Sequence, residues 1–305
     1  MAVYEQTYKR YAGKLTPEWS RFLIIPRHAY ESIFSSKLFT AFFVICFLPL
    51  LLEAIFIYLH HNYTALTIME ASVRDLIPID NSFFRFFTYL QGFFAFFLAL
   101  LLGPPLVARD LRNNALPLYL CRPFSRTEYV IGKMSVILLL LSTVTWIPQL
   151  LLFFFQSYLQ GFAWFKANLW IASAIFIASV VWILLLALLT QTISALVKWR
   201  VVASGLLLGL FIIPSAFAEI INLMFQTRWG SLLSLSALMK SVTDGLFGLF
   251  ERVTGTISFR DFNDEIREVL LIEPPLWCSW AALFLVCAIC LAILSWKVKA
   301  YEVVK

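Results

Sequence analysis

The chain has 305 residues, of which 61% are hydrophobic and only 14% are charged. An average soluble domain has about 25% charged residues, so this composition excludes an ordinary soluble fold and indicates an integral membrane protein. The net charge of +6 fits basic cytoplasmic loops beside anionic lipid, and we expect a lipid bilayer rather than a nucleic acid as partner.

Residues 1–36 are polar and basic, without the apolar run and small-residue cleavage site of a secretory signal peptide. Thr16-Pro17-Glu18 is typical of a helix start, with a cap, a proline at the first position and an acid in the first turn. Pro26 should kink or end this helix. We expect an amphipathic helix that lies along the inner membrane surface.

Residues 37–305 are predicted to form one all-α transmembrane domain. Six apolar segments are long enough to cross the hydrocarbon core, which takes about 20 residues per helix. Pro148 in the third segment and Pro214 in the fifth should break or bend them. The six predicted spans are approximately Leu38–Leu59, Phe83–Val107, Lys133–Gln156, Asn168–Thr190, Val201–Phe225 and Leu276–Trp296.

A polar stretch, residues 107–133, connects the second and third spans and contains an expected cytoplasmic loop over 108–131. The positive-inside rule retains short basic loops in the cytoplasm. The stretch predicts a short helix over Arg109–Leu116, stopped by the following proline, and a second helix capped by Ser125 with Glu128 in the capping-box position. Composition alone leaves open a solvated loop that only sets orientation. The basic residues of the stretch are Arg109, Arg112, Arg122, Arg126 and Lys133.

One part of this stretch reads Tyr119-Leu-Cys-Arg-Pro-Phe-Ser-Arg126 and then Gly132-Lys133. It resembles the cytoplasmic loop of ABC exporter permeases of the type-two family, whose members typically read Leu-Ser-Arg-Pro-(apolar)-Ser-Arg, a short spacer and Gly-Lys. In that family the loop follows the second transmembrane helix and contains the coupling helix that docks on the ATP-hydrolysing subunit. Here Cys121 stands where Ser is frequent, and Asn-Asn-Ala over 113–115 where many members have an acidic residue followed by Gly-Thr.

The resemblance implies two permease subunits, as a homodimer or heterodimer, paired with two ATPase subunits that bind ATP and Mg. This chain has no G-x-x-x-x-G-K-[ST] phosphate-binding loop, so we expect it to be neither an enzyme nor the holder of a cofactor. The N-terminal helix would be the family's connecting helix, which touches the ATPase, with a plain interfacial anchor as the alternative. The residues expected to couple the chain to the ATPase are Arg109, Asp110, Arg112, Asn113, Arg122 and Arg126.

The segment 226–273 connects the fifth and sixth spans on the outer side. Apolar residues recur at helical spacing over Leu235–Leu246, interrupted by Lys240 and Asp244, which predicts a shallow or re-entrant amphipathic helix rather than a seventh crossing. Phe259–Leu271 alternates acids with apolar residues and is predicted to be a surface helix. The resemblance also implies re-entrant external helices at this position.

Three polar residues of the fifth span, Ser215, Glu219 and Asn222, are spaced by four and three, so they should share one helix face. Polar groups in lipid cost free energy, so this stripe should face a partner helix, the cavity or its outer gate, opposite polar residues of the second span. By resemblance the second and fifth spans line the central cavity; a static hydrogen-bonded packing seam is the alternative. The candidate translocation-path residues are Ser215, Glu219, Asn222, Gln91, Thr88 and the intramembrane acid Glu53.

Two other classes remain open, a secondary transporter and a membrane scaffold subunit, each without an ATPase partner. A secondary transporter would bind ions at broken helices in repeated halves, and the sequence shows no convincing internal repeat. The Cys287-Ala-Ile-Cys290 spacing lies in an apolar helix and is expected to pack rather than to bind a metal. Gly205-x-x-x-Gly209 allows close helix approach, within the subunit or across a dimer.

The distribution of basic residues predicts the orientation. Sixteen of the 24 Lys and Arg residues fall on the side of the two termini, which predicts that both termini and the 108–131 loop are cytoplasmic in a multi-pass protein of the bacterial inner membrane. A membrane-impermeant thiol reagent should therefore leave Cys121 unlabelled in intact cells and label it once the membrane is opened. Labelling from outside would show that the orientation is inverted.

Overall fold

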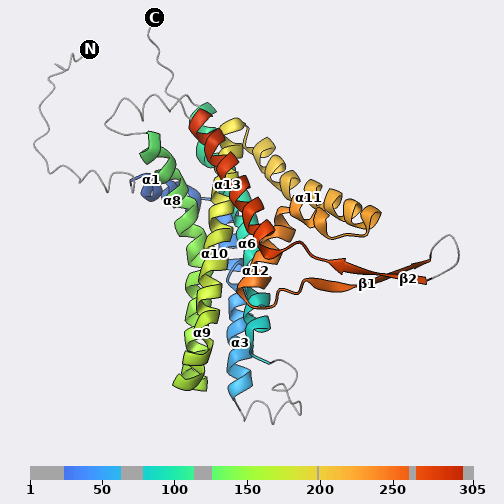
Figure 1. Cartoon of the computed structure of the whole chain (residues 1–305). Coiled ribbons are helices and arrows are strands. Elements are labelled where there is room, and N and C mark those ends of the chain that lie inside the picture. The colour runs from blue at the N-terminus through green and yellow to red at the C-terminus, as the bar shows by residue number, and fades with distance from the viewer. Residues whose placement is uncertain (1–23, 63–77, 113–125, 198, 261–265, 298–305) are drawn as a thin grey trace, which may run out of the picture.

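The computed structural model describes residues 24–62, 78–112, 126–197, 199–260 and 266–297 (Figure 1). Within these residues, six segments are long and apolar enough to cross a membrane, which confirms the six predicted spans and a multi-span helical membrane protein. The first span consists of α2 (Lys37–Ile45) and α3 (Leu48–His61), and the third of α8 (Arg126–Val144) and α9 (Trp146–Gln160). The second, fourth, fifth and sixth spans are α6 (Asn81–Arg112), α10 (Phe162–Leu196), α11 (Arg200–Phe225) and α13 (Leu276–Lys297).

Helix α10 is the central helix of the bundle (Figure 1). It is the most buried of the six spans and packs against α6, α8, α9, α11 and α13. Its most buried stretch is Leu185–Thr192, where every side chain is buried. The apolar core therefore forms around α10, and the other spans expose more of their apolar surface.

The most extensive helix contact lies between α10 and α6. A Cβ atom added at Gly103 of α6 would lie 2.4 Å from the Cβ of Thr190, closer than real Cβ atoms come. Three turns away on α6, the carbonyl oxygen of Gly92 accepts a hydrogen bond from Trp182 Nε1 at 2.8 Å. Glycine at these two positions lets the two backbones approach, as small residues commonly do between membrane helices.

The first and third spans are each broken near the middle. The first span divides at Cys46 and the third at Thr145. Pro49 and Pro148 follow these breaks in the first turns of α3 and α9, where a missing N–H removes no helical hydrogen bond. The predicted break at Pro148 is confirmed, whereas Pro214 lies inside α11, which continues as one helix.

The segment between α11 and α13 contains a 3-10 helix, η2 (Trp229–Leu233), and the amphipathic helix α12 (Leu235–Leu246), which confirms the predicted helix there. The predicted surface helix over Phe259–Leu271 is wrong. This region forms the antiparallel strands β1 (Val253–Arg260) and β2 (Ile266–Ile272), which extend away from the bundle (Figure 1). Alternation with period two and frequent β-branched residues favour strands over a helix.

Helix α1 (Ile24–Phe34) is the described part of the predicted N-terminal amphipathic segment, and it lies beside α8 (Figure 1). Helix α6 continues to Arg112, so the second span and the start of the predicted loop helix form one helix instead of two. The remaining loop, 113–125, lies outside the described residues, together with the predicted Ser125 cap. We call the end of the bundle that carries α1 and Arg112 the loop end, and the opposite end, with Asn81, the far end.

Replacing Gly103 by Ala should destabilise the protein, because the added methyl group would force Thr190 away from its packed position. Overpacking of this kind costs about 1–3 kcal/mol, and the melting temperature of the purified protein in detergent measures it. Gly205→Ala is the matched control, because a Cβ atom at Gly205 meets no atom within 4 Å. An equal loss of stability in both variants would contradict the packing argument.

Candidate functional site

A buried ion pair joins the two helices that carry the 108–131 loop. Lys133 Nζ of α8 lies 2.8 Å from Asp110 Oδ2 of α6, and the two side chains are only 9% and 14% exposed. Tyr129 donates its hydroxyl hydrogen to the same Asp110 oxygen at 2.8 Å. Charge-assisted contacts with so little exposure are costly to break, so this group, which we call the loop clamp, fixes the spacing of α6 and α8.

Helix α1 is attached to the same region. The Tyr30 hydroxyl donates to the carbonyl oxygen of Val136 in α8 at 2.9 Å. Burial raises the pKa of Tyr30 to about 12, so its phenol stays protonated and remains a donor at physiological pH. Ile25 and Ile33 pack against the apolar core from the same helix. The described part of the N-terminal segment is therefore docked on the third span.

Four of the six predicted coupling residues lie in or beside the loop clamp. Arg109 and Arg112 lie in the last turn of α6, and Arg126 is the first residue of α8. Asp110 is held inside the subunit by Lys133 and Tyr129. The other two predicted coupling residues, Asn113 and Arg122, lie outside the described residues, so contact with an ATPase stays a prediction for the whole set.

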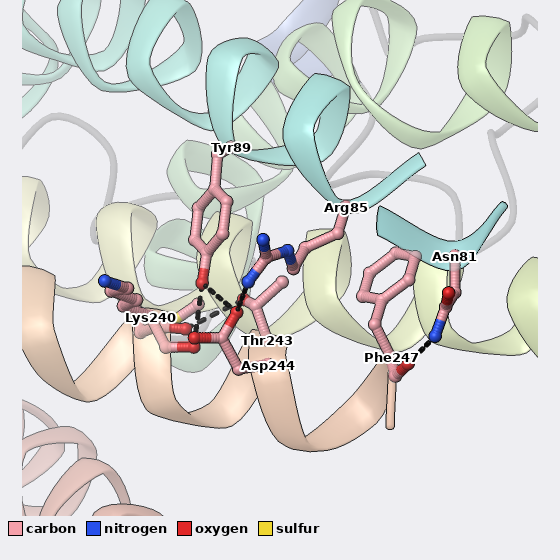
Figure 2. Close-up of polar contacts among 8 residues, drawn as sticks. Asn81, Arg85, Tyr89, Lys240, Thr243, Asp244 and Phe247 are labelled. Carbon is pink, nitrogen blue, oxygen red and sulfur yellow. Dashed lines mark hydrogen bonds and ion pairs between the residues drawn. The ribbon is translucent and has the colours of Figure 1, made fainter. Parts of the chain in front are cut away.

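At the far end, polar contacts attach α12 to α6 (Figure 2). Arg85 of α6 lies 2.8 Å from the Asp244 carboxylate of α12. The Tyr89 hydroxyl is within 2.9 Å of the same carboxylate oxygen and 2.8 Å from a backbone carbonyl of α12. Asn81 Nδ2 donates to the carbonyl oxygen of Phe247 at 2.8 Å. The contacts of its carboxylate explain why Asp244 interrupts the apolar pattern of α12.

The structure divides the predicted polar stripe of the fifth span. The Ser215 hydroxyl lies 2.7 Å from Ser234 Oγ, and Asn222 Oδ1 accepts a hydrogen bond from Gly230 N at 2.9 Å. Both residues thus bind the segment that precedes α12, while Glu219 between them is exposed. The two bonded residues fit the packing seam that the sequence left open, and a role in transport stays a prediction.

Gln91 and Thr88 of the second span bind the first and third spans. Gln91 Nε2 donates to the carbonyl oxygens of Cys46 at 2.9 Å and Val144 at 2.6 Å, which lie at the two helix breaks. Thr88 Oγ1 accepts a hydrogen bond from Gln149 Nε2 of α9 at 2.9 Å. Glu53 is fully buried in α3, which packs against both α6 and α9. We call Glu53, Thr88, Gln91 and Gln149 the polar seam of these helices. Gln91 therefore does not lie opposite the stripe.

A cavity of about 390 Å³ lies between α6, α10, α11 and α12. This volume falls in the range of about 300–1,000 Å³ that is usual for small-molecule sites. Its wall includes the polar residues Thr88, Tyr89, Thr145, Ser179, Ser236 and Thr243, and of the predicted path residues Thr88 lines it. Most of the wall is apolar, formed by Phe93, Phe96, Phe97, Trp182, Phe211 and Met239.

Sequence reasoning missed several residues of these sites. Arg85 and Asp244 carried a usable signal, because each is a charged residue inside an otherwise apolar pattern. Gln149 carried a similar signal, because it is a polar residue inside the apolar third span, directly after Pro148. Trp182 carried none, because it lies in a uniformly apolar helix of a chain with ten tryptophans.

A scan of the chain against protein-family models found no match, and a search of the curated proteins found no relative. The family resemblance of the 107–133 stretch therefore depends on that stretch alone. Among the residues that the structure describes, no group of three or more His, Cys, Asp or Glu side chains could hold a metal ion. Cys287 and Cys290 are free thiols.

Replacing Lys133 by Met should leave the Asp110 carboxylate buried without its cation, which lowers the free energy of unfolding by about 3–5 kcal/mol. The double variant Lys133→Met with Asp110→Asn removes both charges and should recover most of this loss. Thermal unfolding in detergent measures both, with the exposed far-end residue Lys166→Met as control. A double variant as unstable as the single one would contradict the role given to the ion pair.

Proposed function

We propose that this chain is the membrane-spanning permease subunit of an ATP-driven ABC exporter. The observation that carries the proposal is the 107–133 stretch, which resembles the coupling loop of type-two permeases and begins and ends at helices joined by the loop clamp. Two permease subunits would pair with two ATPase subunits, and ATP and Mg would bind to the ATPases. This chain would supply the path and receive the ATPase movement.

The contacts at the loop end support a route for that movement. A displacement of the 108–131 loop would act on α6 and α8 together, because Asp110 and Lys133 connect them. The N-terminal helix would move with the third span, because Tyr30 binds its backbone. Helix α6 would pass the displacement to α12 through Arg85 and Asp244 at the far end. One helix would thus link the ATPase side of the subunit to its external helix.

The cavity of about 390 Å³ supports a hydrophobic or lipidic substrate class. It touches α6 and α11, the two spans that the resemblance expects to line the path. Its aromatic wall suits an apolar body, which is what a hydrophobic or lipidic substrate would present.

A secondary transporter is the second candidate, because the first and third spans are broken. Transporters of that class bind ions at discontinuous membrane helices near the middle of the bilayer. The breaks at Cys46 and Thr145 both border the polar seam that contains Glu53. Co-purification of an ATPase distinguishes the candidates, because only the ABC subunit requires one.

The double variant Arg112→Ala with Arg126→Ala should insert in the membrane normally but recover less ATPase on purification. Charge-assisted contacts across an interface are worth about 2–5 kcal/mol when they are buried, so loss of two should weaken the complex strongly. Quantitative co-purification and ATPase activity in reconstituted vesicles measure the effect. Lys166→Ala with Lys240→Ala is the matched control, because it removes two exposed basic residues from the far end.

Full ATPase recovery and unchanged transport in the Arg112 and Arg126 variant would reject the coupling role. An equal loss in the control variant would show that total charge, and not the loop, governs the complex. If no ATPase co-purifies with the wild-type chain under any condition, the secondary transporter becomes the better account.

A further inference from the structure

A fully buried carboxyl group lies in the far-end half of the first span. Glu53 of α3 is 0% exposed, and neither of its oxygens has a hydrogen-bond partner among the described residues. A buried carboxylate is normally paired with a cation, because removing an isolated charge from water is very costly. The helices packed against α3 do not provide one: α9 contains no Lys or Arg, and Arg85 of α6 is bound to Asp244.

Two glutamines of the polar seam present unsatisfied oxygens as well. Gln149 donates through Nε2 to the carbonyl oxygen of Phe84 at 3.2 Å and to Thr88 Oγ1 at 2.9 Å. Gln91 donates through Nε2 to the two backbone carbonyls at the helix breaks. Because each amide nitrogen faces two acceptors, the amide orientations are fixed. The Oε1 atoms of both glutamines are left buried without a partner among the described residues.

Glu53, Thr88 and Gln149 lie at similar depth in the bundle. Gln91 binds the breaks at Cys46 and Val144 together, Glu53 follows Cys46 by seven residues and Gln149 follows Val144 by five, and Thr88 binds Gln149. About one helical turn toward the far end of each lie Ile57, Phe84 and Phe153, which belong to a single buried cluster. The rings of Phe84 and Phe153 are 5.8 Å apart. Toward the loop end, Gln91 binds the breaks that precede α3 and α9. The three helices therefore meet both above and below this level, where Gln149 binds Thr88 and the buried Glu53 lies on the neighbouring α3.

We propose that the polar seam binds one monovalent hard cation, with the Glu53 carboxylate and the Gln149 side-chain oxygen as ligands. Gln91 closes the site toward the loop end. The available groups are carboxylate and amide oxygens without sulfur or imidazole, which is the donor set of hard cations and not of zinc or copper. One carboxylate matches one positive charge, so the occupied site is neutral and the burial of Glu53 is explained.

A cation accounts for these acceptors better than a proton on Glu53 does. A protonated carboxyl group gains a single O–H donor and satisfies one acceptor oxygen. A cation contacts several oxygens at once, so it can satisfy both Glu53 oxygens and an amide oxygen together.

Polar side chains of α9 and α3 also lie beyond the cluster of Ile57, Phe84 and Phe153, toward the far-end surface. Gln156 lies two turns beyond Gln149 on α9 and is buried, and its Nε2 faces Gln160 Oε1 at 3.4 Å. The same Gln160 oxygen is 2.9 Å from His61 Nε2 at the exposed ends of α3 and α9. The inference does not depend on an ATPase partner, so its failure would leave the proposed function untouched.

The test compares the melting temperature of the purified full chain in sodium, lithium, potassium and choline chloride at equal ionic strength. A ligand that binds only the folded state stabilises it in proportion to the logarithm of its concentration. At least one alkali ion should raise the melting temperature above that in choline. Glu53→Gln keeps the side-chain shape and should abolish this shift, whereas the exposed acid Glu251→Gln should retain it.

Direct binding of radioactive sodium to the wild-type chain, displaced by unlabelled alkali ions, gives a readout that does not require a folded variant. If Glu53→Gln fails to fold, Gln149→Leu should fold and bind the labelled ion more weakly. The absence of any ion-specific shift together with no displaceable binding would overturn the proposal. A stability change that follows pH and ignores ion identity would also overturn it, because the occupant would then be a proton.

Discussion

The close packing of α6 against α10 is the constraint on which the rest of the bundle depends. Membrane helices gain little from the hydrophobic effect when they associate in lipid, so van der Waals contact between close backbones has to stabilise the pair. Gly103 against Thr190 permits that approach, and the bond from Trp182 to Gly92 fixes rotation about the helix axes. With these two helices set, the other spans pack around α10.

Helix α6 also links the two ends of the subunit. Its loop end carries Asp110, which binds Lys133 of the third span. Its far end carries Arg85 and Tyr89, which bind α12. Between them, Gln91 and Thr88 bind the first and third spans. Helices α8, α9, α10 and α12 therefore all contact this one helix through a polar group, although apolar side chains supply most of its sequence.

Hydropathy was sufficient to predict the membrane spans from the sequence, but not the pairing of strands or of polar side chains. The six spans and α12 follow from apolar length and helical spacing, and the structure has them at the predicted places. The β1–β2 hairpin was predicted as a helix, because over a short stretch acids alternating with apolar residues fit either period. The polar stripe shows a different limit: spacing placed Ser215, Glu219 and Asn222 on one face, but only tertiary contacts decide which of them binds a neighbouring segment. Two bind the segment before α12, and Glu219 does not.

The single amide group of Gln91 makes the two broken spans a cooperative unit. Its two N–H groups satisfy one carbonyl at each break, at Cys46 and at Val144. If the backbone at one break moves, the Gln91 amide group that also binds the other break is displaced. The free-energy effects of changes at the two breaks are therefore not additive. A change in the first span thus affects the third through a side chain of the second, so the three spans respond to a perturbation together.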